Sequence, residues 1–202
     1  MLQELNLEML PEVFDHCISF WHIESPEKTP PGLTLNSFAL ELARRNHMLW
    51  HEEDKARRTD MDDSLIATVK RAIDRLNQQR NDLIEHLDEA ILAQVSLAAK
   101  GTAETINSET PGSIVDRISI LSLKIFHMDE DCRRSDISAE HRERSLNRYE
   151  VLRQQRKDLY GSLVQLMDDY INGRKQMKLY KQYKMYNDPT LNPELYRISK
   201  KN

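Results

Sequence analysis

The sequence predicts an all-α protein, and composition, periodicity and an internal repeat all point that way. Only 5 of the 202 residues are Gly, whereas Glu, Leu, Arg, Lys, Gln and Met, which favour helices over strands, are abundant. Apolar residues recur at helical spacing along five segments. Two stretches repeat at one offset. We therefore expect a single domain, 1–202, in which two duplicated helical hairpins form a four-helix bundle, with an N-terminal helix and a C-terminal strap added.

Residues 1–33 are expected to form the N-terminal helix and a linker. Apolar side chains share one helical face from about Leu5 to Trp21, and Pro26, Pro30, Pro31 and Gly32 then break the chain. The first hairpin repeat, 34–98, places one helix from about Asn36 to Arg58 and a longer one from about Leu65 to Ala99. The turn at 60–64 supplies capping residues, and Gly101 ends the longer helix.

A linker, 99–111, precedes the second hairpin repeat, 112–173. Thr110-Pro111-Gly112-Ser113 is typical of a helix start, with Thr as the cap and Pro in the first turn. The exposed N–H groups of such a start can also hold an anion. Asp116 and Arg117 follow, where the first repeat has Leu40 and Glu41. The last helix runs from about Ala139 to Asn172, before Gly173.

The repeat is the most informative pattern in the chain. LWHEEDKARRTD from Leu49 matches IFHMDEDCRRSD from Ile125, and LNQQRNDL from Leu76 matches LRQQRKDL from Leu152. Both matches have an offset of 76 residues. Two matches in one register indicate duplication of a hairpin, because chance similarity between charged helices would not keep a common offset.

Charge and hydropathy predict a cytoplasmic protein. Uncharged stretches such as 90–99 are too short to span a bilayer, and the N-terminus carries acids where a signal peptide needs bases. Cys17 and Cys132 have no partners at metal-ligand spacing. Residues 174–202 carry eight bases and two acids, so the remaining chain has a net charge of −10. We therefore expect no binding of nucleic acid, except weakly through the basic tail.

Five polar residues fall on the inward stripes of the hairpins: Asn46, Glu53, Arg80, Asp129 and Arg156. Buried charges need partners. Helix rise places Glu53 too far from Arg80 within one hairpin, so we expect Glu53 to pair with Arg156 and Asp129 with Arg80, as a structural layer. In the alternative, like charges gather. The two acids then suit a cation, and the two arginines suit an anionic ligand, a phosphate or a carboxylate.

His51 lies three residues before Asp54, and His127 three before Glu130. This spacing puts imidazole and carboxylate on one helical face, as in di-iron bundles. Because Arg80 and Arg156 on the partner stripes would repel a metal ion, we predict no metal centre and no cofactor. His51 and His127 remain candidate proton carriers.

The tail, 174–202, interleaves Tyr180, Tyr183 and Tyr186 with Lys178, Lys181 and Lys184. Such a segment can bind single-stranded nucleic acid or a membrane surface. We favour a strap in which the tyrosines pack on the acidic body and the lysines meet its carboxylates.

Four motifs, in order, resemble a bacterial family of uncharacterised proteins, the domain of unknown function 4254. They are N-x-x-L-W-x-x-E-D-x-A-R from Asn46, I-D-x-x-N-Q-x-R-N-D from Ile73, T-P-G-S-I-x-D-R from Thr110 and K-M-Y-N-D-P from Lys184. The resemblance implies a bacterial source, an all-helical single domain and relatives among cell-envelope glycan genes. It implies no activity.

Two hypotheses of function remain. The first is a non-catalytic partner-binding or accessory protein, linked to envelope glycan metabolism and acting with a protein partner or as a homodimer. The second is an enzyme or binder of an anionic small ligand that uses Asn46, Glu53, Arg80, Asp129 and Arg156, with His51 or His127 carrying a proton.

Overall fold

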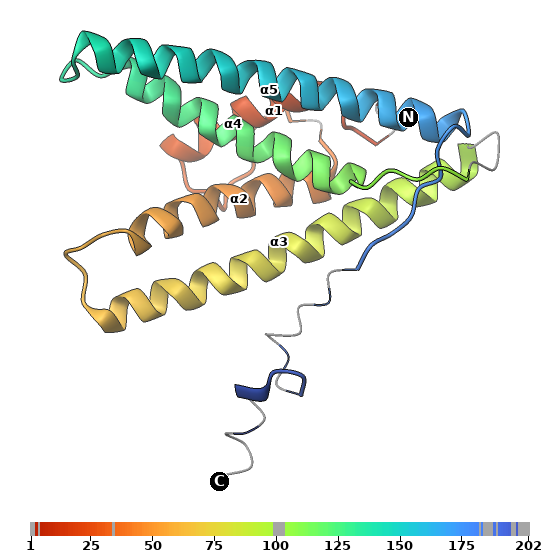
Figure 1. Ribbon diagram of the computed structural model, residues 1–202, viewed down its shortest axis with the longest axis horizontal. Coiled ribbons are helices and arrows are strands. Elements are labelled where there is room, and N and C mark those ends of the chain that lie inside the picture. Colours follow the sequence, from red (N-terminus) through yellow and green to blue (C-terminus); the bar gives the residue numbers. More distant parts are fainter. Residues whose placement is uncertain are drawn as a thin grey trace.

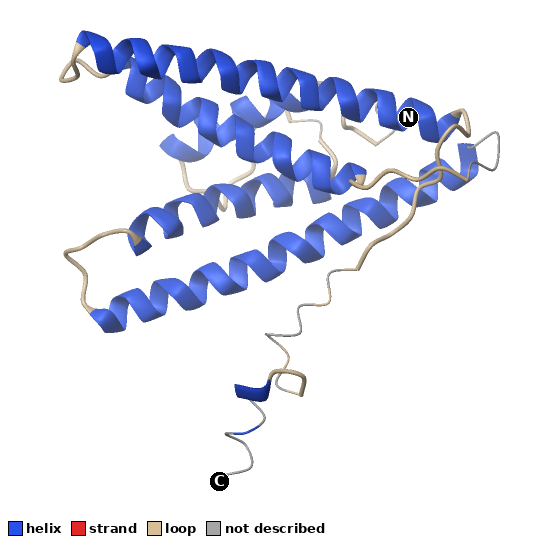
Figure 2. Cartoon of the chain, viewed as in Figure 1, coloured by secondary structure: helices blue, strands red, loops and turns tan. Residues whose placement is uncertain are grey.

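The computed structural model describes residues 3–197 except for 4, 34, 99–103, 182, 184–187, 189, 195 and 196. Its regular structure is helical, which confirms the all-α prediction (Figure 2). Within the described part of the chain, no helix is long and apolar enough to cross a membrane. Cys17 and Cys132 are free thiols, as expected. The predicted helix end at Gly101 lies outside the described residues.

Five helices make up the fold: α1 (Leu10–Ile23), α2 (Ser37–Ala56), α3 (Asp63–Ala98), α4 (Pro111–Arg133) and α5 (Ala139–Ile171). Side chains cap three of them, because Asn36, Thr110 and Ser138 accept hydrogen bonds from the first-turn N–H groups of α2, α4 and α5. Gly173, at a φ of 64°, follows the end of α5. The first helix begins later than predicted, because Met9 takes a left-handed conformation with a φ of 52°.

The helices form two antiparallel pairs, α2 with α3 and α4 with α5, and α1 packs against α4 (Figure 1). Helix α4 lies at the centre, since it also contacts α2 and α3. Helices α3 and α5 lie at the outer edges and diverge toward the turns of their pairs. The arrangement is therefore open on one side, where a closed bundle of four helices would have α3 and α5 in contact along their lengths.

The hydrophobic core forms where all five helices meet. Each helix contributes at least one fully buried side chain: Phe14, Leu42, Leu87, Ile118 and Leu163. Helix α5 joins this core only through its last third, because Ser145 is the sole buried residue of α5 before Leu163. The core thus fixes α1, α2 and α4 firmly against one another and holds α5 mainly by one end.

The start of α4 is closed by a carboxylate of α3. Asp88 is buried, and its Oδ1 accepts a hydrogen bond of 2.7 Å from the N–H of Gly112. A Cβ atom at Gly112 would lie 2.7 Å from the carbonyl oxygen of Ile84 and 2.9 Å from the Asp88 carboxylate, so only glycine permits this approach. The anion at this helix start is therefore the protein's own side chain.

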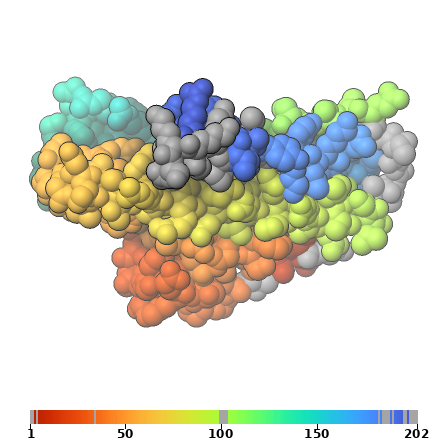
Figure 3. Space-filling model, turned by 90° about the horizontal axis from the view of Figure 1, so that it is seen from below, coloured from red at the N-terminus to blue at the C-terminus, as the bar shows by residue number. Residues whose placement is uncertain are grey.

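The first part of the C-terminal segment runs beside α3, where Figure 3 shows it against the yellow-green helix. Lys181 forms ion pairs with Glu85 at 3.0 Å and Glu89 at 2.6 Å. Tyr183 is 86% exposed, so the predicted packing of the tyrosines on the body is wrong at this residue. Lys184 and Tyr186 lie outside the described residues.

Candidate metal centre

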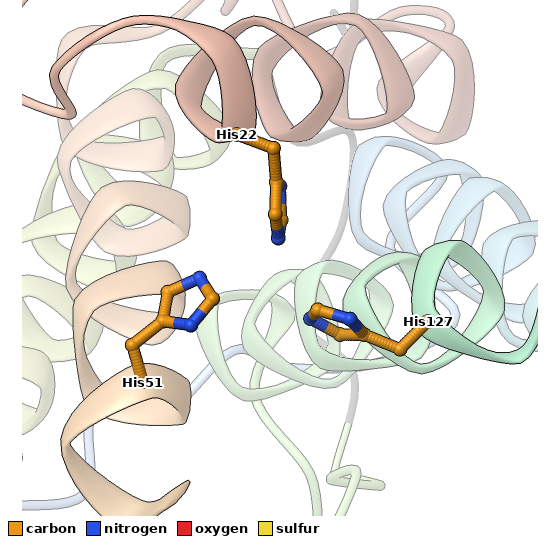
Figure 4. Close-up of side chains that lie close together, drawn as sticks. All are labelled: His22, His51 and His127. Carbon is orange, nitrogen blue, oxygen red and sulfur yellow. The ribbon is translucent and has the colours of Figure 1, made fainter. Parts of the chain in front are cut away.

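Three histidines from three helices converge at one point. His22 lies in the last turn of α1, His51 in the second half of α2 and His127 in the second half of α4. Figure 4 shows the three rings pointing toward a common centre. One ring nitrogen of each lies within 4.8 Å of the other two.

The packing of the helices brings these side chains together. His51 and His127 are the histidines that match at the 76-residue offset, and their ring centroids lie 5.9 Å apart. The ring of His22 lies 5.1 Å from His51 and 5.0 Å from His127. It reaches them because α1 packs against α4 and ends beside these two residues.

Hydrogen bonds fix the proton positions on two of the rings. Nδ1 of His22 lies 2.7 Å from the carbonyl oxygen of Ile18, and Nδ1 of His127 lies 2.8 Å from Oε2 of Glu130. A carbonyl oxygen and an ionised carboxylate only accept hydrogen bonds, so each Nδ1 carries the proton and donates it. In the neutral form of a ring with its proton on Nδ1, Nε2 carries a bare lone pair. Metal-binding histidines are oriented in this way.

These Nε2 atoms have no partner in the described structure. Nε2 of His22 and Nε2 of His127 are both buried and accept no hydrogen bond. A buried polar atom without a partner costs about 1–3 kcal/mol, and two lone pairs that face one centre also repel each other. A cation at that centre would remove both costs.

Burial disfavours protonation of two of the three histidines. Desolvation lowers the pKa of His22 and of His51. It lowers the pKa of the adjacent His47 to about 3, with further contributions from the nearby histidines. Glu130 and Asp54 act in the opposite direction, on the pKa of His22 and His51 respectively. Neutral imidazoles with acids close by are the form that binds a metal ion.

Aromatic rings hold two of the histidines in place. Phe126 stacks on His22 with centroids 4.1 Å apart, and Trp50 stacks on His127 at 4.8 Å with an interplanar angle of 10°. Trp50 and Phe126 also match at the 76-residue offset. Each therefore contacts a histidine of a different helix, which restricts the rotamers of the cluster.

The geometry fits a small divalent ion after modest closure. Zinc binds imidazole nitrogen at about 2.0–2.1 Å, so three tetrahedral ligands stand about 3.3 Å apart. The nitrogens here lie within 4.8 Å of one another, a difference that side-chain rotation can close. Three protein ligands leave a fourth position for water or another ligand, as in catalytic rather than structural zinc sites.

Three of the five predicted inward polar residues, Asn46, Arg80 and Arg156, bond across helices, but to partners other than the expected ones. Arg80 meets Asp116 of α4, with Nε to Oδ1 at 2.8 Å and Nη2 to Oδ2 at 2.5 Å. Asn46 donates to the same carboxylate at 2.9 Å and to Ser119 at 2.6 Å. Asp116, the residue that departs from the repeat, is therefore the true partner. It lies close to Arg80 where α4 contacts α3, whereas Asp129 lies near the far end of α4.

Arg156 pairs with Asp15 of α1 through both oxygens of the carboxylate and donates to Ser122 at 2.8 Å. The two remaining acids bind arginines one turn along their own helices, Glu53 with Arg57 and Asp129 with Arg133. The predicted pairs, Glu53 with Arg156 and Asp129 with Arg80, are thus wrong. Local pairs at i,i+4 satisfied the acids, and carboxylates outside the matched stretches satisfied the arginines.

The sequence reasoning singled out His51 and His127 but missed His22, Asp15 and Asp116 as partners. His22 directly follows Trp21, which was placed on the inward face of the first helix, and this adjacency was the available signal. Because a linker, 24–33, separates this helix from the next one, the sequence did not indicate which helices it packs against. Of the two predicted histidine–carboxylate pairs, His127 with Glu130 forms a hydrogen bond, whereas Asp54 affects His51 only through its charge.

Comparison with known proteins identifies the family but no relative of known activity. Residues 36–179 match the model of the family described as "Protein of unknown function (DUF4254)". Searches of curated proteins and of solved structures found no match. The matched region contains His51 and His127, whereas His22 precedes it. Because the match covers well over half of the chain, this protein belongs to that family of proteins of unknown function.

Proposed function

We propose that this protein binds a divalent transition-metal ion through His22, His51 and His127. One observation carries the proposal: two of the three rings have their Nδ1 protons committed to other acceptors, while their buried Nε2 atoms face the shared centre without a partner. Imidazole ligands suit zinc, copper, nickel and iron rather than magnesium or calcium.

The proposed ion has a role in chemistry rather than in holding the fold together. The protein supplies three ligands, and an ion with an open position lowers the pKa of a bound water. The core of Phe14, Leu42, Leu87, Ile118 and Leu163 contains none of the three histidines, so a purely structural ion is not needed. We therefore favour metal-dependent activity at this centre, which revises the expectation of no metal.

Cobalt substitution tests the site directly. Metal-free protein titrated with Co²⁺ is expected to bind one equivalent and to develop the visible d–d absorption of a tetrahedral nitrogen site. His22→Ala, His51→Ala and His127→Ala should each lose this spectrum, since two imidazoles bind an ion far more weakly than three.

His86→Ala is the matched control, because His86 is an exposed histidine of α3 outside the cluster. It is expected to retain the full Co²⁺ spectrum. A spectrum that survives all three cluster substitutions, or the absence of Co²⁺ binding by the unaltered protein, would exclude the centre.

Partner binding is a second candidate function. Arg80 and Arg156 are both committed to carboxylates, which supports a structural layer over an anionic ligand site and removes the main argument for that alternative. We also propose that the two hairpins arose by duplication, that the protein is bacterial and cytoplasmic, and that it has an accessory role in envelope glycan metabolism. Light scattering of the purified protein at several concentrations tests the homodimer: a constant monomer mass would oppose it.

A further inference from the structure

A hollow between α4 and α5 opens beside the histidine cluster, and we propose that it binds an amphiphilic anion, an apolar chain carrying a phosphate or carboxylate. The hollow has a volume of about 640 Å³, within the usual range for small-molecule sites. This proposal goes beyond metal binding and does not depend on it, because it rests on the hollow alone.

The walls of the hollow are apolar. Trp50 comes from α2, Met128 from α4, and Val151 and Leu152 from α5. Val151 is 55% exposed although its neighbours are apolar. This stretch of α5 packs on α4 without any covering helix. An apolar chain laid in the hollow would remove these side chains from water.

The polar groups of the hollow are two cations, two amides and the imidazole of His127. Lys124 and Arg148 line it together with Asn147 and Gln155, and no Asp or Glu does. Within the described residues, neither Lys124 nor Arg148 forms an ion pair, although most arginines of this chain do. Two uncommitted cations beside an apolar wall favour a ligand with a negative head group.

The charge pattern selects against other occupants. A neutral lipid or an apolar helix would leave both cations unused at the rim. A second copy of the chain would have to present a carboxylate and an exposed apolar patch to the same hollow, and such a dimer is one of the outcomes that the test below distinguishes. A single amphiphilic anion satisfies both features at once.

Calorimetric titration of the full chain with decyl phosphate, below its micelle concentration and with EDTA present, tests the proposal. EDTA removes any ion at the histidines, so that binding cannot arise from phosphate on a metal. We expect saturable one-to-one binding of decyl phosphate, binding about tenfold weaker for decanol, and none for inorganic phosphate alone.

Variants locate the ligand. Lys124→Gln and Arg148→Gln should each weaken decyl phosphate about tenfold while leaving decanol unchanged, and Val151→Asp should abolish both. Arg153→Gln is the matched control, because Arg153 is on the same helix but lines a different hollow. This variant should bind decyl phosphate as tightly as the original protein does. Equal effects of Arg148→Gln and Arg153→Gln would overturn the proposal. The proposal would also be overturned if the protein bound no decyl phosphate and instead formed a dimer that Val151→Asp dissociates.

His127 borders both sites. Failure here and failure of the metal centre are still distinguishable, because the two experiments use different probes and substitute different residues. Loss of Co²⁺ binding in His22→Ala leaves the decyl phosphate titration in EDTA unaffected. Far-UV circular dichroism of each variant confirms that it folds.

Discussion

Gly112 shows how one residue sets the crossing of two helices. Gly112→Ala should destabilise the protein by about 1–3 kcal/mol, because its Cβ would lie 2.7 Å from the backbone oxygen of Ile84. Gly161→Ala is the matched control: Gly161 is exposed within α5, and a Cβ there meets nothing within 4 Å. It should stabilise by about 0.5–1 kcal/mol. Urea unfolding measures both, and equal signs for the two would contradict the packing argument.

Asp88 gives stability a dependence on pH. Burial raises the pKa of Asp88 to about 6, although the hydroxyl of Thr110 and the N–H of Gly112 oppose the shift. The folded state therefore binds more protons than the unfolded state between about pH 4 and 6. The contribution of this group is fully present below about pH 4 and is lost as pH rises through 6. The loss is at most about 3 kcal/mol.

The comparison with Asp88→Asn isolates this effect. Asn keeps an oxygen that accepts from Gly112 but does not titrate in this range. The free energy of unfolding of the original protein, minus that of the variant, should therefore fall from pH 4 to pH 7. Urea denaturation at several pH values gives this difference, and a difference that rises with pH would show that the cap stabilises the charged form.

At the scale of the helices, replacing each of the two inward arginines is expected to lower the free energy of unfolding by a different amount. Arg80→Met leaves the buried carboxylate of Asp116 without its counter-charge, which costs about 3–5 kcal/mol. Arg156→Met leaves Asp15, whose side chain is 45% exposed and can be hydrated, so a cost of about 1 kcal/mol is expected. Chemical denaturation of the two variants provides the comparison. Similar costs would mean that Asp116 is hydrated when Arg80 is removed.

Helices were predictable from the sequence, but their partners were not. Periodicity, caps and turns are local, so the starts of α4 and α5 at Pro111 and Ala139 agree with the expectation. The docking of α1 depends on contacts across a linker, and no local pattern encodes it. For this reason Asp15 and His22 were missed, although both are partners of residues already singled out. His51 and His127 were found because each precedes a carboxylate by three residues, a local spacing that recurs at the 76-residue offset.

For the whole molecule, an ion at the histidines would join α1, α2 and α4. Because it binds the folded chain only, it should add stability that grows as RT ln(1 + [metal]/Kd). Thermal unfolding should therefore shift upward with added Zn²⁺ in the original protein and in His86→Ala. His51→Ala should show no shift. An equal shift in His51→Ala would mean that zinc acts elsewhere on the chain.

The open side of the molecule has a consequence for local opening. Helix α5 enters the common core only from about Leu159 onward, and its earlier turns rest mainly on α4, apart from the ion pair of Arg156 with Asp15 of α1. Backbone amides of residues 146–158 are thus expected to exchange with deuterium through fraying of the helix, whereas those of 163–171 exchange only when the whole domain unfolds. One continuous helix would then contain two classes of protection, with the boundary near Leu159.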